Sequence, residues 1–493
     1  MRAVIIGAGI AGIAAAIRLR CLGLEVEVFE ANAHPGGKLA EITINGYRFD
    51  AGPSLFTLPE QVEELFQLAG KKTVDHFTYQ QLATITHYFY PDGTRLTAHA
   101  DLDRYVQEIE DKLGVSGQNV RDFLADSRRK YELTAKVFLQ NSLHKVRTYF
   151  TKETARAVLH IGQLDLFSTM NAVNERRLQH PKLVQLFNRY ATYNGSDPYQ
   201  TPATLNIIPH LEHGIGAFFP TKGMYSITQS LFELAQDLGA KFHFNSPVER
   251  ILVEERGQNR ATGVQVAGQH VGAEVVVCNM DVVNAYRKLM PQVRQPQKIL
   301  NQPKSSSALI FYWGIARQFP ELDLHNIFFS ANYRDEFQHI FTARDIGPDP
   351  TVYVNITSKY KPDDAPPGGE NWFVMINVPN NSGQDWEVLI SRARAHILAK
   401  LGRMLGTDLA PLIVAEGILD PRSIEAKTSS SQGALYGNSS NNRYAAFLRH
   451  ANFSTQIKGL YFCGGSVHPG GGIPLSLLSA RIVGGLVADD LSK

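Results

Sequence analysis

A short glycine motif between two apolar segments constrains the fold of this chain more than any other feature. The run GAGIAG directly follows the apolar residues 2–6 and leads into residues 11–22, whose alanines, isoleucines and leucines predict a helix. Residues 25–30 are again strand-like and end in an acid. A buried strand, a glycine turn, a helix and a second strand within about 30 residues are typical of a βαβ unit. The sequence therefore predicts an α/β domain built on a parallel sheet.

The glycines match the spacing GxGxxG of dinucleotide-binding loops. Gly7 permits the tight turn, Gly9 lets the backbone approach a pyrophosphate, and Gly12 lets helix and strand pack closely. The start of the helix offers free N–H groups to the phosphates. Glu30 stands where a carboxylate binds both ribose hydroxyls, which favours FAD or NAD over NADP. A tight turn without a ligand is the alternative. The predicted contacts are Gly7, Gly9, Ile10, Ala11, Gly12, Glu30 and Ala31.

A second glycine loop, Pro35-Gly36-Gly37-Lys38, favours FAD over NAD. Another close approach of the backbone, together with a cation, suits a ligand that runs on past the first loop. At this point the sequence resembles the flavoprotein superfamily of amine oxidases, protoporphyrinogen oxidases and carotenoid desaturases. The resemblance implies FAD in an extended form, with Gly37 and Lys38 among its contacts. Arginine is common in the superfamily at this position, and lysine keeps the charge without the bidentate geometry.

The resemblance also implies the fold class: a Rossmann-like α/β FAD-binding domain of the amine oxidase/glutathione reductase type, a mixed-sheet substrate domain, and a helical lid or membrane-facing subdomain. We expect the FAD-binding domain in residues 1–72, 215–284 and 440–493, the substrate domain in 73–100 and 285–439, and the helical subdomain in 101–214. Apolar alternation predicts a three-stranded meander over 247–255, 261–268 and 273–281. By resemblance, the backbone of Val248 in this meander contacts the adenine.

The segment CGGSVHPGGGIPLSLLSAR near the C-terminus crowds glycines in front of an apolar helix. In the same superfamily the last strand and helix close over the flavin. The resemblance implies that Gly464 and Gly465 pass the ribityl chain and phosphate, that residues 470–472 skim the ring, and that the helix starting near Pro474 stabilises reduced flavin. This segment and the matching run FDAGPSL add the predicted contacts Gly465, Ser466, Gly472, Ile473, Pro474, Gly52, Pro53, Ser54 and Leu55.

His468 within this segment has two interpretations. It either lies near the flavin and accepts a proton, or it is a turn histidine that hydrogen-bonds the backbone before Pro469. It is the one candidate catalytic residue, and the proton acceptor is otherwise unassigned. The remaining histidines are scattered without ligand spacing, so we predict no metal site.

The run HPGGGIP resembles bacterial carotenoid desaturases, and the block TVYVNITSKYKPDDAPPGGENWFVMINVP is most similar to the hydroxycarotenoid 3,4-desaturases among them. The resemblance implies an FAD-dependent enzyme that forms C=C bonds in an acyclic or hydroxylated carotenoid, by hydride transfer to flavin N5 plus proton loss. Alternatives are a phytoene or neurosporene desaturase or isomerase of the same family. More remote are an amine or porphyrinogen oxidase and a non-enzymatic prenyl-binding protein of the Rab GDP-dissociation inhibitor type.

Charge and cysteine usage narrow the partners and the compartment. A net charge of +2 argues against a nucleic-acid surface. The three cysteines are far apart, which excludes a vicinal redox disulfide and fits a reducing cytoplasm. No apolar run reaches the length of a transmembrane helix, so we expect peripheral attachment to the membrane through the helical residues 101–189, where basic and apolar side chains alternate. Oxygen or a quinone is the expected electron acceptor.

Overall fold

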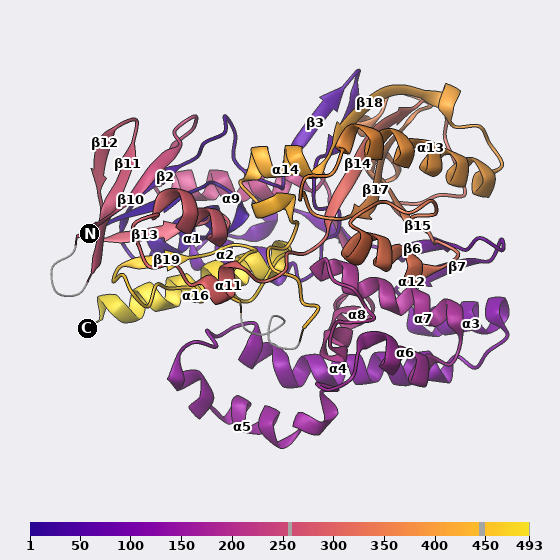
Figure 1. The fold of residues 1–493 in the computed structure, drawn as a ribbon, viewed down its shortest axis with the longest axis horizontal. Helices are drawn as coiled ribbons and strands as arrows, with labels where there is room; N and C mark the ends of the chain where they lie inside the picture. The colour runs from indigo at the N-terminus through magenta and orange to yellow at the C-terminus, as the bar shows by residue number, and fades with distance from the viewer. Residues whose placement is uncertain (255–258, 443–448, 493) are drawn as a thin grey trace.

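The computed structural model describes residues 1–254, 259–442 and 449–492, and a parallel five-stranded sheet occupies the left part of the molecule in Figure 1. The strand order is β19-β13-β1-β2-β9. The bounds are β1 Arg2–Ile6, β2 Glu25–Phe29, β9 Lys241–His243, β13 Val275–Cys278 and β19 Leu460–Phe462. Every neighbouring pair is parallel. The predicted βαβ unit is therefore confirmed, with its helix α1 at Ile10–Cys21.

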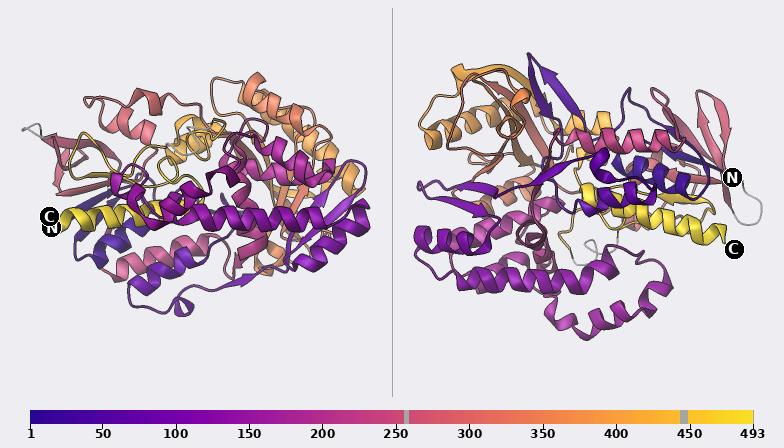
Figure 2. Two further views of the ribbon diagram at one scale, coloured as in Figure 1. Left: turned by 90° about the horizontal axis from the view of Figure 1, so that it is seen from below. Right: turned by 180° about the vertical axis from the view of Figure 1, so that it is seen from behind.

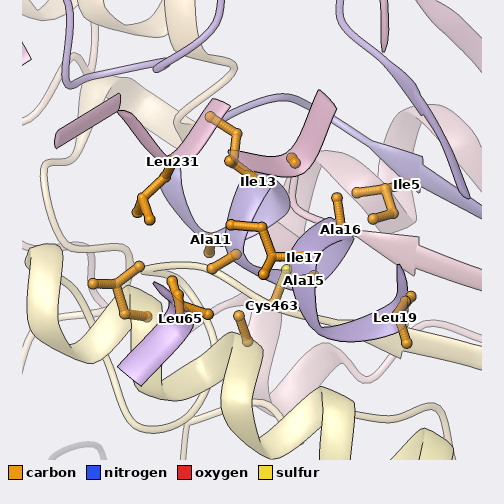
Figure 3. Close-up of a cluster of buried hydrophobic side chains, with 14 of the residues drawn as sticks. Ile5, Ala11, Ile13, Ala15, Ala16, Ile17, Leu19, Leu65, Leu231 and Cys463 are labelled. Atoms are coloured by element: carbon orange, nitrogen blue, oxygen red, sulfur yellow. The ribbon is translucent and has the colours of Figure 1, made fainter. Parts of the chain in front are cut away.

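Helix α1 is the centre of the core beside this sheet. It packs against α16 (Ile473–Leu491), α9 (Tyr225–Asp237) and α2 (Glu60–Leu68). Figure 3 shows Ile13 and Ile17 of α1 among Leu65, Leu231 and Cys463 from the surrounding elements. Small residues dominate α1, which lets three helices approach it closely. The first and last parts of the chain are thus joined in one core.

The predicted three-stranded meander is wrong in its third strand. The meander consists of β10 (Val248–Glu254), β11 (Arg260–Val266) and the short β12 (Gln269–Gly272). Residue 255 of the predicted first strand lies outside the described residues, as do residues 443–448 and 493 of the predicted FAD-binding domain. The run Val275–Cys278 instead lies beside β1 in the parallel sheet. The physical reason is burial, because an apolar strand that is covered on both faces belongs inside a parallel sheet.

A mixed seven-stranded sheet forms the second layer, in the order β18-β14-β17-β16-β15-β6-β7. Its strands are β6 Thr84–Phe89, β7 Arg95–His99, β14 Ser307–Ile315, β15 His325–Phe328, β16 Val352–Ile356, β17 Glu370–Val378 and β18 Ile413–Leu419. Side chains alternate along β14, so that Leu309 and Phe311 share a core with helix α13 (Trp386–Leu405). Ile310 and Tyr312 point to the other face and line a cavity.

A group of helices lies on one side of the two large sheets (Figures 1 and 2). These are α3 Leu102–Leu113, α4 Gln118–Phe138, α5 Lys152–Leu159, α6 Met170–Leu178 and α7 Pro181–Asn188. Helix α5 projects furthest from the sheets in Figure 1. The remaining named elements include β3 Glu41–Ile44, β4 Tyr47–Asp50, β5 Tyr79–Gln81, β8 Phe218–Pro220, α8 Ile208–His210, α10 Val282–Asn284, α11 Gln297–Leu300, α12 Tyr333–Gln338 and α14 Pro421–Thr428.

Large apolar side chains are exposed around α5. Phe150 is 85% exposed, Leu159 82% and Phe167 79%, which is far beyond what an ordinary surface residue of this type shows. We call this set the α5 patch; it comprises Val146, Tyr149, Phe150, Val158, Leu159, Ile161 and Phe167. Lys152 and Arg156 are exposed among them. In the described part of the chain, no helix is both long and apolar enough to cross a bilayer.

Candidate functional site

One cavity of about 960 Å³ connects the glycine loops with the inner face of the seven-stranded sheet. Every cofactor contact predicted from the sequence lines this cavity, with the exception of Gly12, and His468 lines it as well. The structure therefore brings together segments that are separated by more than 400 residues. Whether each residue binds the ligand stays a prediction, but their convergence on one space is a property of the fold.

Gly12 is absent from the lining because it serves the packing of the loop. A Cβ at this position would lie 2.1 Å from the carbonyl oxygen of Gly7, well inside van der Waals contact. This is the close approach of helix and strand that the third glycine of the motif is expected to provide. Gly9 is the N-cap of α1 and has no side chain to cap the helix, so the first turn of N–H groups faces the cavity.

Asn279 is a residue that sequence reasoning missed. Its Nδ2 donates a hydrogen bond to the carbonyl of Gly7 at 3.3 Å. A Cβ at Gly9 would lie 2.9 Å from that nitrogen, and one at Gly464 would lie 2.6 Å from Oδ1. Asn279 therefore ties the first glycine loop to the end of the last strand. A single asparagine after a buried strand carries no sequence signal that could have revealed this role.

Glu30 is buried at the cavity wall and already holds three donors. Its Oε2 accepts from the backbone N–H of Ala8 at 2.7 Å. Its Oε1 accepts from the N–H and the Nδ2 of Asn32, at 2.9 and 2.7 Å. A carboxylate offers about four lone-pair positions, so roughly one remains for a ligand hydroxyl. Binding both ribose hydroxyls, as the sequence predicted, would require one of these donors to give way.

Lys38 places a cation in the wall beside the second loop. Its Nζ donates to the carbonyl of Leu435 at 2.7 Å and to that of Ala434 at 3.2 Å. Burial lowers the pKa of Lys38 to about 8, and the nearby Asp281 opposes that shift. The ammonium group therefore joins the glycine loop to residues 434–435, a segment that was predicted to belong to the substrate domain.

The C-terminal glycines face different neighbours within the protein, and their contacts with the cofactor stay predictions. A Cβ at Gly471 would lie 2.7 Å from the ring of Tyr436, and one at Gly465 would lie 3.2 Å from the Cα of Gly471. These glycines are needed because protein backbone and side chains pack against them. Gly472 differs: its φ is +102° and a Cβ there would meet no described atom within 4 Å. Gly472 therefore opens onto the cavity, at the N-cap of α16.

Ser466 and His468 are held by the protein rather than aimed freely at the cavity. The Oγ of Ser466 accepts from the N–H of Val282 at 3.0 Å. The Nε2 of His468 donates to the carbonyl of Asn141 at 2.9 Å, which links the last glycine loop to the helical part. Burial lowers the pKa of His468 to about 4. The backbone-bonded interpretation of this histidine therefore has direct support, and its unprotonated Nδ1 leaves the proton-acceptor interpretation as a prediction.

The opposite end of the cavity is made of side chains. Apolar and phenolic residues of the seven-stranded sheet line it: Ile310, Tyr312, Ile327, Tyr353, Phe373 and Met375. A buried polar group adjoins them, in which Arg189 donates to the hydroxyls of Tyr193 and Tyr88 at 3.0 and 3.2 Å, and Tyr190 donates to Glu212 at 2.7 Å. Sequence reasoning missed this wall, because its members alternate with core residues on strands that are far apart in the chain.

The residues present fit FAD. Two helices, α1 and α16, begin at glycine N-caps on the cavity wall, and their N-terminal N–H groups suit a pyrophosphate and an electron-rich ring edge. The buried carboxylate of Glu30 retains acceptor capacity for a sugar hydroxyl, as derived above. Gly472 leaves open the space that a flat ring needs. In the described residues, no three His, Cys, Asp or Glu side chains gather in a way that would hold a metal ion.

Comparisons with known proteins agree with this site. The model of the family "Flavin containing amine oxidoreductase" matches residues 10–487. The chain is 51% identical over 486 residues to a 1-hydroxycarotenoid 3,4-desaturase of Flavobacterium sp. (strain P99-3), covering 99% of both chains. It is 31% identical to a phytoene desaturase of Phycomyces blakesleeanus, covering 99% of this chain and 85% of that protein.

Among solved structures, an oxidoreductase from Methanosarcina mazei superposes with a TM-score of 0.64 at 17% identity, over 99% of this chain and 100% of the other. At that identity the likeness speaks for the fold alone, and it agrees with the Rossmann-like architecture derived above. The family, the enzyme class and the cofactor follow from the match of the family model over nearly the whole chain. The chain belongs to the flavin-containing amine oxidoreductase family, and it is an oxidoreductase whose cofactor is FAD.

Proposed function

We propose that this protein is an FAD-dependent carotenoid desaturase, and that it favours the 3,4-desaturation of a 1-hydroxycarotenoid. One observation carries the proposal: the glycine-built end of the cavity is continuous with a long end walled by Ile310, Tyr312, Phe373 and Met375. Such a space suits a long apolar chain that enters beside a flavin. The 51% identical relative named above supports the choice of substrate.

The division of labour follows the three regions predicted from the sequence. Residues 1–72, 215–284 and 440–493 hold FAD, residues 73–100 and 285–439 hold the carotenoid, and residues 101–214 form the helical lid or membrane-facing part. The strands of the parallel sheet fall in the first region, and those of the seven-stranded sheet, whose inner face lines the cavity, fall in the second. Residues 434–437 extend the first region, since Lys38 and Gly471 both contact them.

Desaturation removes a hydride from one carbon and a proton from its neighbour. FAD, when bound, supplies the acceptor for the hydride. The conjugated chain spreads positive charge along its double bonds, so the main task of the protein is to hold the chain in register and exclude water. His468 is neutral at pH 7 because its pKa is lowered to about 4 by burial. Its Nε2–H is fixed on Asn141, which leaves Nδ1 as a nitrogen that can accept the proton.

Anaerobic reduction of the bound flavin by a panel of compounds tests the proposal. We expect bleaching of the flavin absorption by a 1-hydroxylated acyclic carotenoid, with formation of one additional conjugated double bond. Amines and porphyrinogens serve as the comparison, because a different oxidase on the same fold would respond to them. Reduction by phytoene or neurosporene in preference to the hydroxylated compound would move the activity to the other desaturases of the family. Purified protein without flavin absorption would favour a prenyl-binding role.

We also propose that the protein attaches peripherally to the cytoplasmic face of a membrane through the α5 patch. The patch combines large exposed apolar side chains with Lys152 and Arg156, and such a face enters the headgroup region of a bilayer. The substrate would then pass from lipid to the cavity without crossing water. A quinone in the same bilayer, or oxygen, would receive the electrons.

Flotation with anionic vesicles tests this attachment. The double variant Phe150→Ser and Leu159→Ser should shift most of the protein to the soluble fraction. Val74→Ser is the matched control, since Val74 is 73% exposed but lies outside the patch. Equal flotation of the double variant and the parent protein would contradict the proposal. Reoxidation of reduced enzyme by oxygen and by a soluble quinone, compared at equal concentrations, identifies the acceptor.

A further inference from the structure

A hydrogen-bonded chain of side chains leads from the cavity wall into the seven-stranded sheet. The Oγ of Ser54 lies 2.9 Å from the hydroxyl oxygen of Tyr353. That hydroxyl lies 2.7 Å from the Nδ1 of His325, and the Nδ2 of Asn355 lies 3.2 Å from the same nitrogen. Ser54 and Tyr353 line the cavity, whereas His325 and Asn355 are each 2% exposed. Ser54 is also one of the predicted cofactor contacts, whereas Tyr353, His325 and Asn355 have no role in the mechanism proposed above.

Which group donates and which accepts in each of these hydrogen bonds follows from Asn355, the member farthest from the cavity. The Nδ2 of Asn355 donates to the carbonyl of Leu324 at 3.0 Å, which identifies it as the amide nitrogen, a pure donor. A proton on the Nδ1 of His325 would face this donor, so Nδ1 carries the single lone pair of the ring, which the nearer hydroxyl of Tyr353 at 2.7 Å and the Nδ2 of Asn355 at 3.2 Å share. Burial lowers the pKa of His325 to about 3, which agrees with a neutral ring.

The donors and acceptors in the two hydrogen bonds nearer the cavity then follow as well. Tyr353 donates its hydroxyl proton to the Nδ1 of His325, so its oxygen is free to accept. Ser54 donates to Tyr353, and the remaining capacity of its Oγ consists of lone pairs. The chain thus offers the cavity a hydrogen-bond acceptor at Ser54. A hydrocarbon chain has no O–H or N–H group to donate to such an acceptor, whereas the O–H of an alcohol can donate to it.

Ser54 lies between the two ends of the cavity, because it contacts Tyr353 of the side-chain wall and is two residues from Gly52, which packs against the second glycine loop. A Cβ at Gly52 would lie 1.9 Å from the carbonyl of Lys38. The Nζ of Lys38 donates to Leu435, and the adjacent Tyr436 packs on Gly471. Gly472, which opens onto the cavity, follows directly. In a 1-hydroxylated chain the oxygen sits three bonds from the nearer carbon of the pair that becomes the 3,4 double bond, so its binding group must lie close to the glycine-built end.

We propose that the Oγ of Ser54 accepts a hydrogen bond from the hydroxyl group of the substrate, and that Tyr353, His325 and Asn355 are positioning residues that fix Ser54 as an acceptor. The inference rests on the proposed function, because it assigns the hydroxyl of the proposed substrate to a site. It makes Ser54 the residue that distinguishes a hydroxylated end group from a plain one and that sets which carbon pair reaches the flavin.

The test compares two substrates that differ in one hydroxyl group, a 1-hydroxylated acyclic carotenoid and its deoxy counterpart. The parent enzyme should prefer the hydroxylated compound. Ser54→Ala should lower kcat/KM for it about tenfold, in line with the loss of one buried hydrogen bond, and change the value for the deoxy compound less than about threefold. Ser54→Thr, which keeps the acceptor, should restore most of the preference.

Tyr353→Phe tests the positioning role. Without the phenol, the Ser54 hydroxyl can rotate and present its proton instead, so the preference for the hydroxylated compound should fall part of the way. Tyr90→Phe is the matched control: Tyr90 is buried, donates to the carbonyl of Lys182 at 2.8 Å and does not line the cavity. It should leave the substrate preference unchanged. Flavin content and unfolding temperature are measured for each variant to separate misfolding from a change in recognition.

Equal losses on both substrates in Ser54→Ala, with normal flavin content, would overturn the inference. A parent enzyme that does not distinguish the two compounds would overturn it too. If the parent enzyme desaturates neither compound, the proposed function fails, and equilibrium binding of the same pair to parent protein and Ser54→Ala, followed by the absorption shift of the polyene, decides on Ser54 separately. Loss of the binding preference in Ser54→Ala supports the site, and binding without preference in the parent protein refutes it.

Discussion

The two ends of the cavity are built by different means. The glycine-built end consists mainly of backbone: the loops at Gly9 and Gly37 and the start of α16, with the side chains of Glu30 and Lys38 beside them. The other end consists of side chains that project from separate strands, such as Ile310, Tyr353 and Phe373. Where the backbone of a glycine lines the cavity, any added side-chain atom enters the space of the ligand. Where side chains line it, one can be replaced by another of similar volume. The first end therefore specifies the cofactor, and the second end is where substrate choice can change.

The largest effect is expected from Gly472→Val. The branched side chain would enter the open space that the ring of the cofactor requires, so FAD is lost or displaced and turnover falls by orders of magnitude. Flavin content and single-turnover reduction are the measurements. Gly23→Val is the matched control, because Gly23 also has a positive φ, +84°, and a Cβ there would meet no described atom within 4 Å, yet it lies outside the cavity. Parent-like flavin and rate in Gly472→Val would break the contrast drawn here.

A smaller effect is expected when the buried carboxylate loses its charge. Glu30→Gln keeps the size of the side chain but weakens a hydrogen bond to a ligand hydroxyl that is worth about 1.5–3 kcal/mol when charge-assisted. It also disturbs the donors from Ala8 and Asn32. We expect a roughly tenfold to hundredfold loss of FAD affinity, measured by titration of apoprotein. Unchanged affinity would show that the glycine loops alone carry the nucleotide.

Acid should destabilise the glycine-built end and the side-chain end of the cavity over the same pH range. Burial lowers the pKa of nine described histidines below the usual value of about 6.5, four of them to about 3 or 4, so the folded protein resists their protonation while the unfolded chain does not. Their contribution to stability is therefore fully present above about pH 6.5 and falls as the pH decreases toward about 4. The four are His213 and His325, each lowered to about 3, and His450 and His468, each lowered to about 4.

Denaturant midpoints at about pH 7, 6 and 5 measure this loss. Because two of these four histidines lie in the C-terminal segment and two lie near the side-chain end of the cavity, flavin release and loss of tertiary circular dichroism should coincide. A protein that releases flavin at a pH where its tertiary signal is intact would show that the two ends respond to acid separately.

The smallest effect is expected from Met375→Leu. Met375 lines the side-chain end of the cavity, and an exchange of similar volume there should change KM less than about threefold and leave flavin content unchanged. Steady-state kinetics on the hydroxylated carotenoid is the measurement. A collapse of activity in this variant, comparable to that of Gly472→Val, would mean that both ends are equally intolerant.

The contrast between the glycine-built end and the side-chain end explains which parts of the site could be predicted from the sequence. Gly7, Gly9 and Gly12 follow one another within six positions, so the local pattern predicted the βαβ unit and its loop correctly. Ser54 was placed at the cavity by resemblance, but its bond to Tyr353 spans 299 positions and no local pattern reports it. Asn279 was missed, and the strand Val275–Cys278 was assigned to the wrong sheet, for a related reason, since their partners come from the first and last segments of the chain.

The order of strands in the parallel sheet has a consequence for biosynthesis. Strand β13 lies between β1, made from residues 2–6, and β19, made from residues 460–462. The two chain ends meet on the same side of the molecule (Figures 1 and 2). On the ribosome, β1 can pair with β2 early, but β19 and helix α16, which begins at Gly472 on the cavity wall, emerge only with the last residues. The flavin pocket is thus among the last features to form, and an incomplete chain emerging from the ribosome cannot retain the cofactor.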